Sequence, residues 1–277
     1  MSTEKKIRQL PSTDEARLLA LSSRSVEELA GTTLLDRYRL IELRGEGGAA
    51  VVYRGQHVIM QKPVAVKVLR PEHSARQDYI RRFIAEARTV AKLKHEHIVD
   101  ILDIDRTEDG FVFCVMEYLE GEELGATLDR EGPMPVGRAR HIVIQVAEAL
   151  AAAHAVGIVH RDVKPQNIFR VRRAGDDDYV KLLDFGIAKQ VDEQAGITNT
   201  GTVMGTAEYM APEQCRARPV DARADIYSLG VTLFELLSGR CPFEGEGFLD
   251  VLMKHVNERP PRLSVLVPSV SVRRTAS

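Results

Sequence analysis

One short stretch carries most of the polar groups from which a catalytic site could be built. It reads His160-Arg161-Asp162-Val163-Lys164-Pro165-Gln166-Asn167, and Asp184 follows after an apolar run. Carboxylate and amide oxygens are the ligands that Mg²⁺ prefers, and a carboxylate can accept a proton from a hydroxyl group. The combination of an Asp, a Lys and an Asn with a second Asp predicts a magnesium–phosphate site.

A second group is the glycine loop Gly45-Glu46-Gly47-Gly48-Ala49-Ala50-Val51-Val52, between two strand-like runs. Glycine lets the backbone approach a phosphate and turn N–H groups toward it. A glycine-rich hairpin is also a common simple turn, so the loop alone decides nothing. Its strand-to-strand context disfavours a dinucleotide-binding fold, in which a helix follows the glycines.

A lysine follows the apolar residues Val64-Ala65-Val66. Lys67 in such a strand costs desolvation free energy unless it is paired. It is either an edge lysine that reaches water or one partner of an ion pair. Glu86, in the predicted helix that follows, is an available partner, and the pair would hold Lys67 ready for phosphates.

The hydrophobic pattern that must position these residues changes along the chain. The first part predicts a sheet of about five strands and one helix: strands at 38–43, 51–53, 64–69, 98–104 and 111–118, and a helix at 79–93. The second part is mainly helical: helices at 138–156, 225–237 and 248–256, and short strands at 167–171 and 179–183 around a solvated turn at 172–178. Residues 1–35 predict two short helices at best.

The composition disfavours nucleic-acid-binding, disulfide-rich and membrane-spanning proteins. Among 277 residues, 38 Lys and Arg against 40 Asp and Glu give a net charge of −2, so no basic excess indicates nucleic-acid binding. The 3 cysteines are far apart, which disfavours a disulfide framework or a zinc site. The first thirty residues lack an apolar signal core, so we expect no signal peptide, and no apolar run of about 18 residues could span a membrane. We expect a cytoplasmic protein without a nucleic-acid partner.

The motifs together resemble those of protein kinases, specifically the bacterial eukaryotic-like (Hanks-type) serine/threonine kinases. The set is completed by Asp184-Phe185-Gly186 and Ala211-Pro212-Glu213, in the expected order. The resemblance implies an α+β, two-lobed fold with a small, mostly β N-lobe and a larger helical C-lobe. The implied divisions are an N-terminal extension at 1–35, a kinase domain at 36–268 (N-lobe about 36–116, C-lobe about 120–268) and a disordered tail at 269–277.

The resemblance also implies roles for the catalytic residues, with ATP and Mg²⁺ as cofactors. Asp162 would be the catalytic base, and Lys164 would contact the γ-phosphate. Asn167 and Asp184 would bind Mg²⁺. Val90, Ile101, His160 and Phe185 would stack, anchored by Asp225.

The nucleotide would be bound mainly by the N-lobe. Lys67, paired with Glu86, would hold the α- and β-phosphates, and Met116 would precede a hinge whose backbone binds adenine. The residues implied in ATP binding are Arg44, Gly45, Glu46, Gly47, Gly48, Ala49, Ala50, Val51, Val52, Ala65, Lys67, Met116, Glu117, Leu119 and Phe169.

Three departures from the family pattern create further expectations. Ala50 replaces the third loop glycine, which predicts a stiffer loop because Ala tolerates positive φ poorly. Arg44 replaces the usual aliphatic roof over adenine. The chain ends at Ser277, where the family continues with two more helices, so Glu213 lacks an obvious arginine partner. A short C-lobe would favour a homodimer or a stabilising partner.

Three hypotheses for function follow. The first is a protein serine/threonine kinase that phosphorylates protein substrates and itself, with Thr198 and Thr200 as loop phosphosites. The second is an inactive kinase-fold binding module, and the complete catalytic set argues against it. The third is a small-molecule phosphotransferase, which Ala211-Pro212-Glu213 and the long 187–210 segment disfavour.

Overall fold

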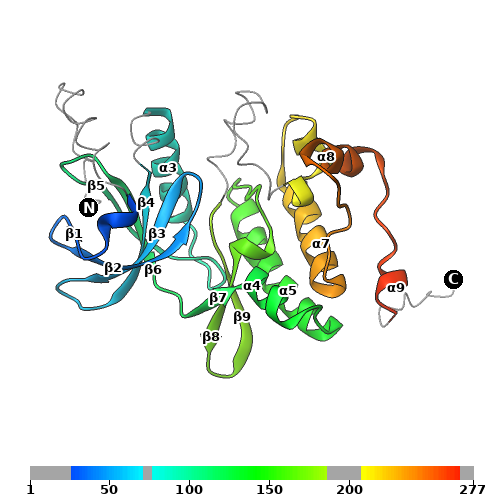
Figure 1. The fold of residues 1–277 in the computed structure, drawn as a ribbon, viewed down its shortest axis with the longest axis horizontal. Coiled ribbons are helices and arrows are strands. Elements are labelled where there is room, and N and C mark those ends of the chain that lie inside the picture. The colour runs from blue at the N-terminus through cyan, green and yellow to red at the C-terminus, as the bar shows by residue number, and fades with distance from the viewer. Residues whose placement is uncertain (1–25, 71–76, 186–206, 269–277) are drawn as a thin grey trace. The chain divides into compact units, whose positions relative to one another are not determined.

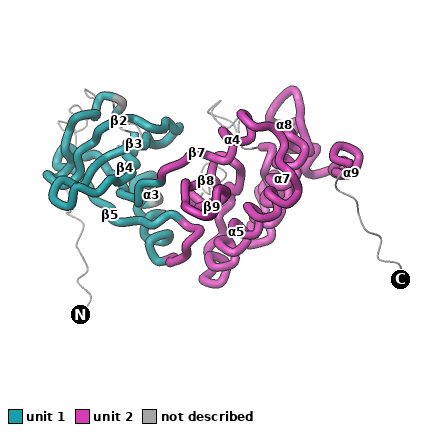
Figure 2. The backbone as a smooth tube through the Cα atoms, turned by 90° about the horizontal axis from the view of Figure 1, so that it is seen from below, with its two compact units in different colours: residues 1–92, 99–119 teal, residues 93–98, 120–277 magenta. Residues whose placement is uncertain are grey.

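The computed structural model describes residues 26–70, 77–185 and 207–268. The chain forms two compact units, and each is described by itself (Figures 1 and 2). Unit 1 comprises residues 1–92 and 99–119, and unit 2 comprises residues 93–98 and 120–277. The change in hydrophobic pattern along the sequence therefore corresponds to a real division of the fold.

Unit 1 is built on an antiparallel sheet of 6 strands in the order β1-β2-β3-β4-β6-β5. Its strands are β1 (Thr33–Leu34), β2 (Tyr38–Glu46), β3 (Ala50–His57), β4 (Pro63–Leu69), β5 (Ile101–Arg106) and β6 (Val112–Glu117). The one long helix described in this unit is α3 (Gln77–Val90), where the helical period was predicted. Successive side chains of a strand point to opposite faces of the sheet.

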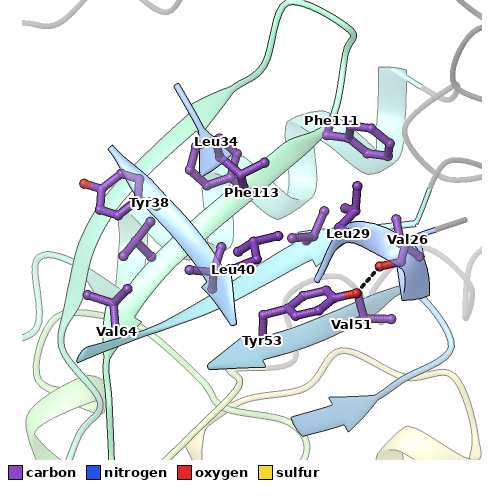
Figure 3. Packing of buried hydrophobic residues seen from close by; sticks show 13 residues of the cluster. Val26, Leu29, Leu34, Tyr38, Leu40, Val51, Tyr53, Val64, Phe111 and Phe113 are labelled. Atoms are coloured by element: carbon purple, nitrogen blue, oxygen red, sulfur yellow. Dashed lines mark hydrogen bonds between the residues drawn. The ribbon is translucent and has the colours of Figure 1, made fainter. Parts of the chain in front are cut away.

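One face of this sheet carries the larger apolar cluster (Figure 3). Val64, Val66 and Val68 of β4 belong to it, together with Tyr53, Leu40 and Phe113. The opposite face packs on α3 through Ile80, Phe83 and Ala87, against Cys114 and Leu69. Residues 65 and 67 alternate with the valines, so Ala65 and Lys67 lie on the α3 face, where both are only partly buried.

The segment before the sheet is part of the same core. Val26 and Leu29, in the short 3₁₀ helix η1 (Val26–Leu29), are almost fully buried, and the Tyr53 hydroxyl donates a hydrogen bond to the Val26 carbonyl (Figure 3). Thr33 and Leu34 then pair with Arg39 and Tyr38 as strand β1. The prediction of about five strands was therefore one short, because a strand of 2 residues carries no readable alternation.

Unit 2 is mainly helical, as predicted. Its helices are α4 (Leu124–Glu131), α5 (Val136–His154), α6 (Pro212–Cys215), α7 (Ala222–Ser238), α8 (Phe248–Asn257) and α9 (Leu263–Leu266), with short 3₁₀ turns η2 (Pro165–Asn167) and η4 (Ala207–Tyr209). Helix α7 begins at the capping Asp221 and ends at Gly239, whose φ of 77° suits glycine. It packs against α5 and buries most of its apolar side chains.

A small antiparallel sheet completes unit 2, in the order β7-β8-β9. Its strands are β7 (Gly121–Glu123), β8 (Ile168–Arg173) and β9 (Asp176–Leu182). The predicted turn at 172–178 was too long. The strands continue to Arg173 and Asp176, and only Ala174 and Gly175 form the turn. Charged residues extend this hairpin because their side chains form ion pairs there, a contribution that the hydrophobic pattern does not show.

Burial of the segment before the sheet leads to a stability prediction. Leu29→Ala should lower the free energy of unfolding by about 2–5 kcal/mol, the usual cost of truncating a buried leucine. Urea denaturation followed by circular dichroism measures this loss. The matched control is Ile59→Ala in the β3–β4 turn, where the side chain is 81% exposed. That control should change stability by less than about 0.5 kcal/mol. Equal, small effects of both substitutions would show that η1 is not part of the core.

Candidate active site

The centre of the candidate catalytic loop, residues 160–167, is fixed by one buried carboxylate. Asp225, in the first turn of α7, is 0% exposed. Its oxygens accept hydrogen bonds from the backbone N–H groups of His160 (2.8 Å) and Arg161 (2.7 Å), and the His154 Nε2 lies 2.7 Å away. A buried carboxylate is costly unless it is hydrogen-bonded. The contacts therefore require the loop to keep this backbone conformation.

His160 connects the loop to the end of β9. Its Nδ1 accepts from the Asp162 N–H (3.2 Å), which leaves the ring proton on Nε2 to donate to the Leu183 carbonyl (2.7 Å). Its ring also packs against Phe185, with 4.6 Å between ring centroids. Burial lowers the pKa of His160, so the ring is neutral near pH 7.

Asp162, Lys164 and Asn167 come together as the sequence predicted. The Asn167 Nδ2 donates to the backbone carbonyl of Asp162 (2.7 Å) and to its Oδ2 (2.9 Å). The Lys164 Nζ lies 3.3 Å from the same Oδ2. These contacts hold the Asp162 carboxylate in place beside a positive charge.

Asn167 and Asp184 lie at the same end of the β8–β9 hairpin. Ile168 pairs with Leu182, and the Leu183 N–H donates to the Asn167 carbonyl (2.8 Å). Because Asn167 uses its Nδ2 toward Asp162, its amide oxygen is the group left to act as a ligand. This oxygen and the exposed carboxylate of Asp184 are a donor set that fits Mg²⁺, which takes few protein ligands when phosphates supply others.

Two residues of the candidate site, Arg161 in the loop and Asp184 after β9, have an uncommon backbone conformation. Arg161 has a φ of 67° and Asp184 a φ of 41°, both in the left-handed region. Such conformations are strained for residues with a side chain and persist only where the surroundings fix them. They adjoin or coincide with the proposed base and a proposed metal ligand, where precise orientation is needed.

Glu123 is an acidic neighbour of this site that sequence reasoning did not find. Burial, and secondarily the charge of Asp184, raises its pKa, while the charge of Lys164 opposes that rise. It lies at the end of β7, opposite Phe169 of β8. No motif in the sequence connects position 123 with Asp184, because strand pairing alone brings them close.

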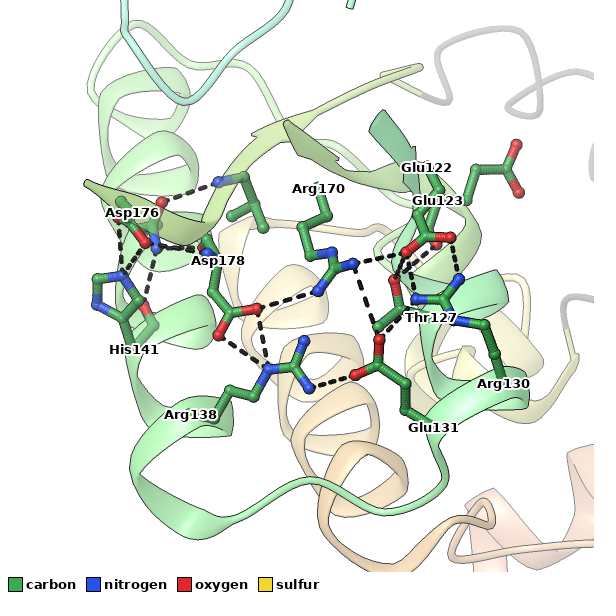
Figure 4. A network of polar contacts seen from close by, with 12 residues as sticks. Glu122, Glu123, Thr127, Arg130, Glu131, Arg138, His141, Arg170, Asp176 and Asp178 are labelled. Atoms are coloured by element: carbon green, nitrogen blue, oxygen red, sulfur yellow. Dashed lines mark hydrogen bonds and ion pairs between the residues drawn. The ribbon is translucent and has the colours of Figure 1, made fainter. Parts of the chain in front are cut away.

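An ion-pair network holds the hairpin from its other side (Figure 4). Arg170 of β8 donates to Glu122 (2.7 Å), and Arg138 of α5 forms a hydrogen-bonded pair with Asp178 at 2.8–2.9 Å. Arg130 also binds Glu122, and the pKa of Glu122 falls to about 2, chiefly through that hydrogen bond. The network ties β7, β8 and β9 to α4 and α5, and thereby supports Phe169 and the strand that leads to Asp184.

Four candidate nucleotide residues of unit 1, Val52, Ala65, Lys67 and Met116, share one face of its sheet, whereas the predicted Val51 is fully buried in the apolar cluster on the opposite face. Val52 of β3 pairs with Lys67 of β4, and Ala65 pairs with Met116 of β6. Val52, Ala65 and Lys67 are all partly buried, unlike the alternating core residues. Glu86 lies in α3, but its side chain is outside the described part, so the Lys67–Glu86 pair remains a prediction.

The glycine loop joins β2 to β3. The Gly47 N–H donates to the Ala50 carbonyl (2.9 Å), and the Arg70 Nε donates to the Gly47 carbonyl (2.9 Å). Ala50 begins β3 and is not among the residues with positive φ. This φ is one that alanine adopts readily, and the stiffer loop expected from Ala50 stays a prediction.

Two further predicted nucleotide residues have partners of their own. Arg44 lies 3.1 Å from Glu42 and is about half exposed, so its guanidinium is directed to a surface carboxylate. The Glu117 side chain accepts from the Asp100 N–H (2.8 Å), and its own N–H donates to the Asp100 carbonyl (3.0 Å). These bonds fix the start of the segment in which Leu119 lies.

Several predictions concern groups beyond these. Gly186, Thr198 and Thr200 lie outside the described residues. Within the described ranges, Glu213 has no hydrogen bond or ion pair through its carboxylate. Arg223 is influenced by the charge of Glu213, but its guanidinium binds Asp221 at 2.7–3.1 Å.

Among helices in the described ranges, none is both long and apolar enough to cross a bilayer.

The chain is similar in sequence to known proteins. The sequence model of the family described as protein kinase domain matches residues 38–267. The chain is 47% identical over 234 residues to the serine/threonine-protein kinase Pkn1 of Myxococcus xanthus, which covers 84% of this chain and 33% of that protein. It is 44% identical over 242 residues to PknA of Mycobacterium tuberculosis, covering 86% and 55%.

Solved structures agree with the sequence comparison. The kinase domain of Mycobacterium tuberculosis PknI has a TM-score of 0.66 and 30% identity, covering 87% of this chain and 84% of that one. The predicted α+β kinase fold, with a β-rich unit and a helical unit, is thus confirmed. The chain spans 33–55% of the length of the curated relatives named above. It belongs to the protein kinase domain family, within which it resembles bacterial serine/threonine-protein kinases.

Proposed function

We propose that this chain is an ATP- and Mg²⁺-dependent kinase domain that transfers the γ-phosphate to serine or threonine hydroxyls of proteins, including its own. The observation that carries this proposal is the Asp162 carboxylate, which lies 3.3 Å from the Lys164 ammonium and 2.9 Å from the Asn167 amide. The identity to bacterial serine/threonine kinases supports it.

In this proposal, Asp162 orients the acceptor hydroxyl and accepts its proton. Lys164 contacts the γ-phosphate and offsets charge as the phosphoryl group is transferred. Asn167 and Asp184 hold Mg²⁺, which would neutralise phosphate charge when bound. Because phosphoryl transfer needs little covalent chemistry from the protein, fixing these groups supplies most of the rate enhancement.

The residues of unit 1 bind the nucleotide. Backbone N–H groups of the loop at 45–50 contact its phosphates, and Lys67 holds the α- and β-phosphates, paired with Glu86. Val52 and Ala65 contact adenine, with the Arg44 stem as an additional cover. Phe169 of unit 2 is also assigned to adenine binding. The backbone between Met116 and Leu119, including Glu117, supplies hydrogen bonds to the base.

The remaining expectations concern organisation. We keep the kinase domain at 36–268, with an extension before it and a tail after it, although residues 26–34 pack in the core of unit 1. Membership of the protein kinase family supports protein substrates, but it does not identify them. A cytoplasmic location, and a homodimer or partner at the C-lobe, remain proposals. The second is supported by the Glu213 carboxylate, for which the described residues supply no hydrogen bond or ion pair.

The proton acceptor is tested by Asp162→Asn. We expect kcat for phosphorylation of a peptide acceptor to fall by about 10²–10⁴, the usual range for loss of general base help. ATP binding should remain, since Asp162 is assigned to the acceptor. Asp109→Asn, at an exposed position in a turn of unit 1, is the matched control and should retain activity. Chelation of Mg²⁺ or Asp184→Ala should stop turnover. A near wild-type rate in Asp162→Asn would exclude this assignment.

The lysine is tested by a double-mutant cycle. Lys67→Ala should remove activity while the fold survives, because Lys67 is only partly buried on its strand. If Lys67 and Glu86 form one pair, the activity losses of Lys67→Ala and Glu86→Ala should be strongly non-additive. The measurement is kcat/KM for ATP in all four proteins. Additive losses would mean that the two side chains do not interact.

A further inference from the structure

Gln214 is a buried amide to which neither the motifs nor the family comparison assigns a role. It lies in the short helix α6 and is 6% exposed. Both ends of its side chain are used. Its Oε1 accepts from the Ala211 N–H (3.0 Å), and its Nε2 donates to the backbone carbonyl of Arg161 (3.1 Å). One side chain thus connects the start of α6 with the residue before Asp162.

The backbone of Arg161 needs such support. Its φ of 67° lies in the left-handed region, which is unfavourable for a residue with a Cβ. Its N–H donates to the buried Asp225 (2.7 Å), and its carbonyl accepts from Gln214. Both polar groups of this strained residue are therefore held by buried side chains from different helices.

The consequence reaches Asp162 through a single peptide unit. The Arg161 carbonyl and the Asp162 N–H belong to the same planar group and point in opposite directions. Gln214 binds the carbonyl, and the His160 Nδ1 accepts from the N–H at 3.2 Å. Together, the two side chains hold both edges of the plane. Rotation of this plane would change the φ of Asp162 and so the direction of its side chain and carboxylate.

We propose that Gln214 is a positioning residue, which fixes the peptide between Arg161 and Asp162 and thereby the direction of the Asp162 carboxylate. This inference rests on the proposed kinase function of the same site. The competing explanation is that Gln214 only caps α6 through its bond to Ala211. The two explanations differ in what happens to the catalytic loop when the amide is removed.

The experiment compares Gln214→Leu and Gln214→Met with Thr232→Val. The two apolar residues keep similar volume and remove both hydrogen bonds. Thr232 is buried as well, but among the described residues its hydroxyl bonds only within α7, to the Ser228 carbonyl. We expect kcat per nucleotide-binding site to fall about 10- to 100-fold in the Gln214 variants, since small misplacements of catalytic groups have effects of this size. KM for ATP should stay near the wild-type value, and Thr232→Val should keep both constants.

Hydrogen–deuterium exchange provides a readout that does not depend on turnover. Amides of the loop at 160–164 should exchange faster in both Gln214 variants than in wild type or Thr232→Val. If the wild-type chain phosphorylated no acceptor, the proposed function would fail, while the exchange result would still decide whether Gln214 holds the loop. Wild-type kcat per binding site, or unchanged loop exchange in both variants, would overturn the proposal and leave Gln214 as a helix cap.

Discussion

The site depends first on the burial of one carboxylate. Asp225 lies at 0% exposure in α7, where an isolated charge would be strongly unfavourable. The N–H groups of His160 and Arg161 and the ring of His154 compensate for the lost hydration. Removing any of these donors would leave the charge less well solvated. The helical core and the catalytic loop are therefore stabilised by the same contacts.

Two sets of contacts extend from Asp225. The His160 ring binds the Leu183 carbonyl at the end of β9, and Phe185 packs on the same ring. Arg161 precedes Asp162, and the Asp162 carboxylate is held by Asn167 and Lys164. The β8–β9 hairpin brings the end of η2 close to Asp184, and the network around Arg170 and Asp178 secures that hairpin. Strained backbone at Arg161 and Asp184 is tolerated because each lies within this set of contacts.

Much of the fold and part of the site could be predicted from the sequence because they depend on residues that are close together in the chain. The helical period identified α3, α5 and α7, and the spacing of Asp162, Lys164 and Asn167 identified a cluster that the structure brings together. Those residues are close in the chain, so one turn of backbone determines their proximity. Where a pattern was misjudged, as in the turn predicted at 172–178, charged residues that belong to strands β8 and β9 were assigned to the turn.

Other features depend on contacts between distant residues and leave no local signal. Strand β1 is too short to show alternation, and the burial of Val26 depends on Tyr53. Glu123 approaches Asp184 only because β7 pairs with β8. Gln214 and Arg161 are 53 residues apart in the sequence. Sequence patterns would usually predict that an amide side chain in a short helix lies at the surface. Such tertiary hydrogen bonds require the coordinates.

The most direct test of the account is amide exchange at His160 and Arg161 in Asp225→Asn. The substitution preserves size but replaces one accepting oxygen with an NH₂ group, so one of the buried donors loses its acceptor. Hydrogen–deuterium exchange with mass spectrometry should show faster exchange across the loop at 160–164 than in wild type, accompanied by lower phosphoryl transfer per nucleotide-binding site. Wild-type exchange in this loop, with undiminished transfer, would contradict the claim that the Asp225 carboxylate holds the catalytic loop in place.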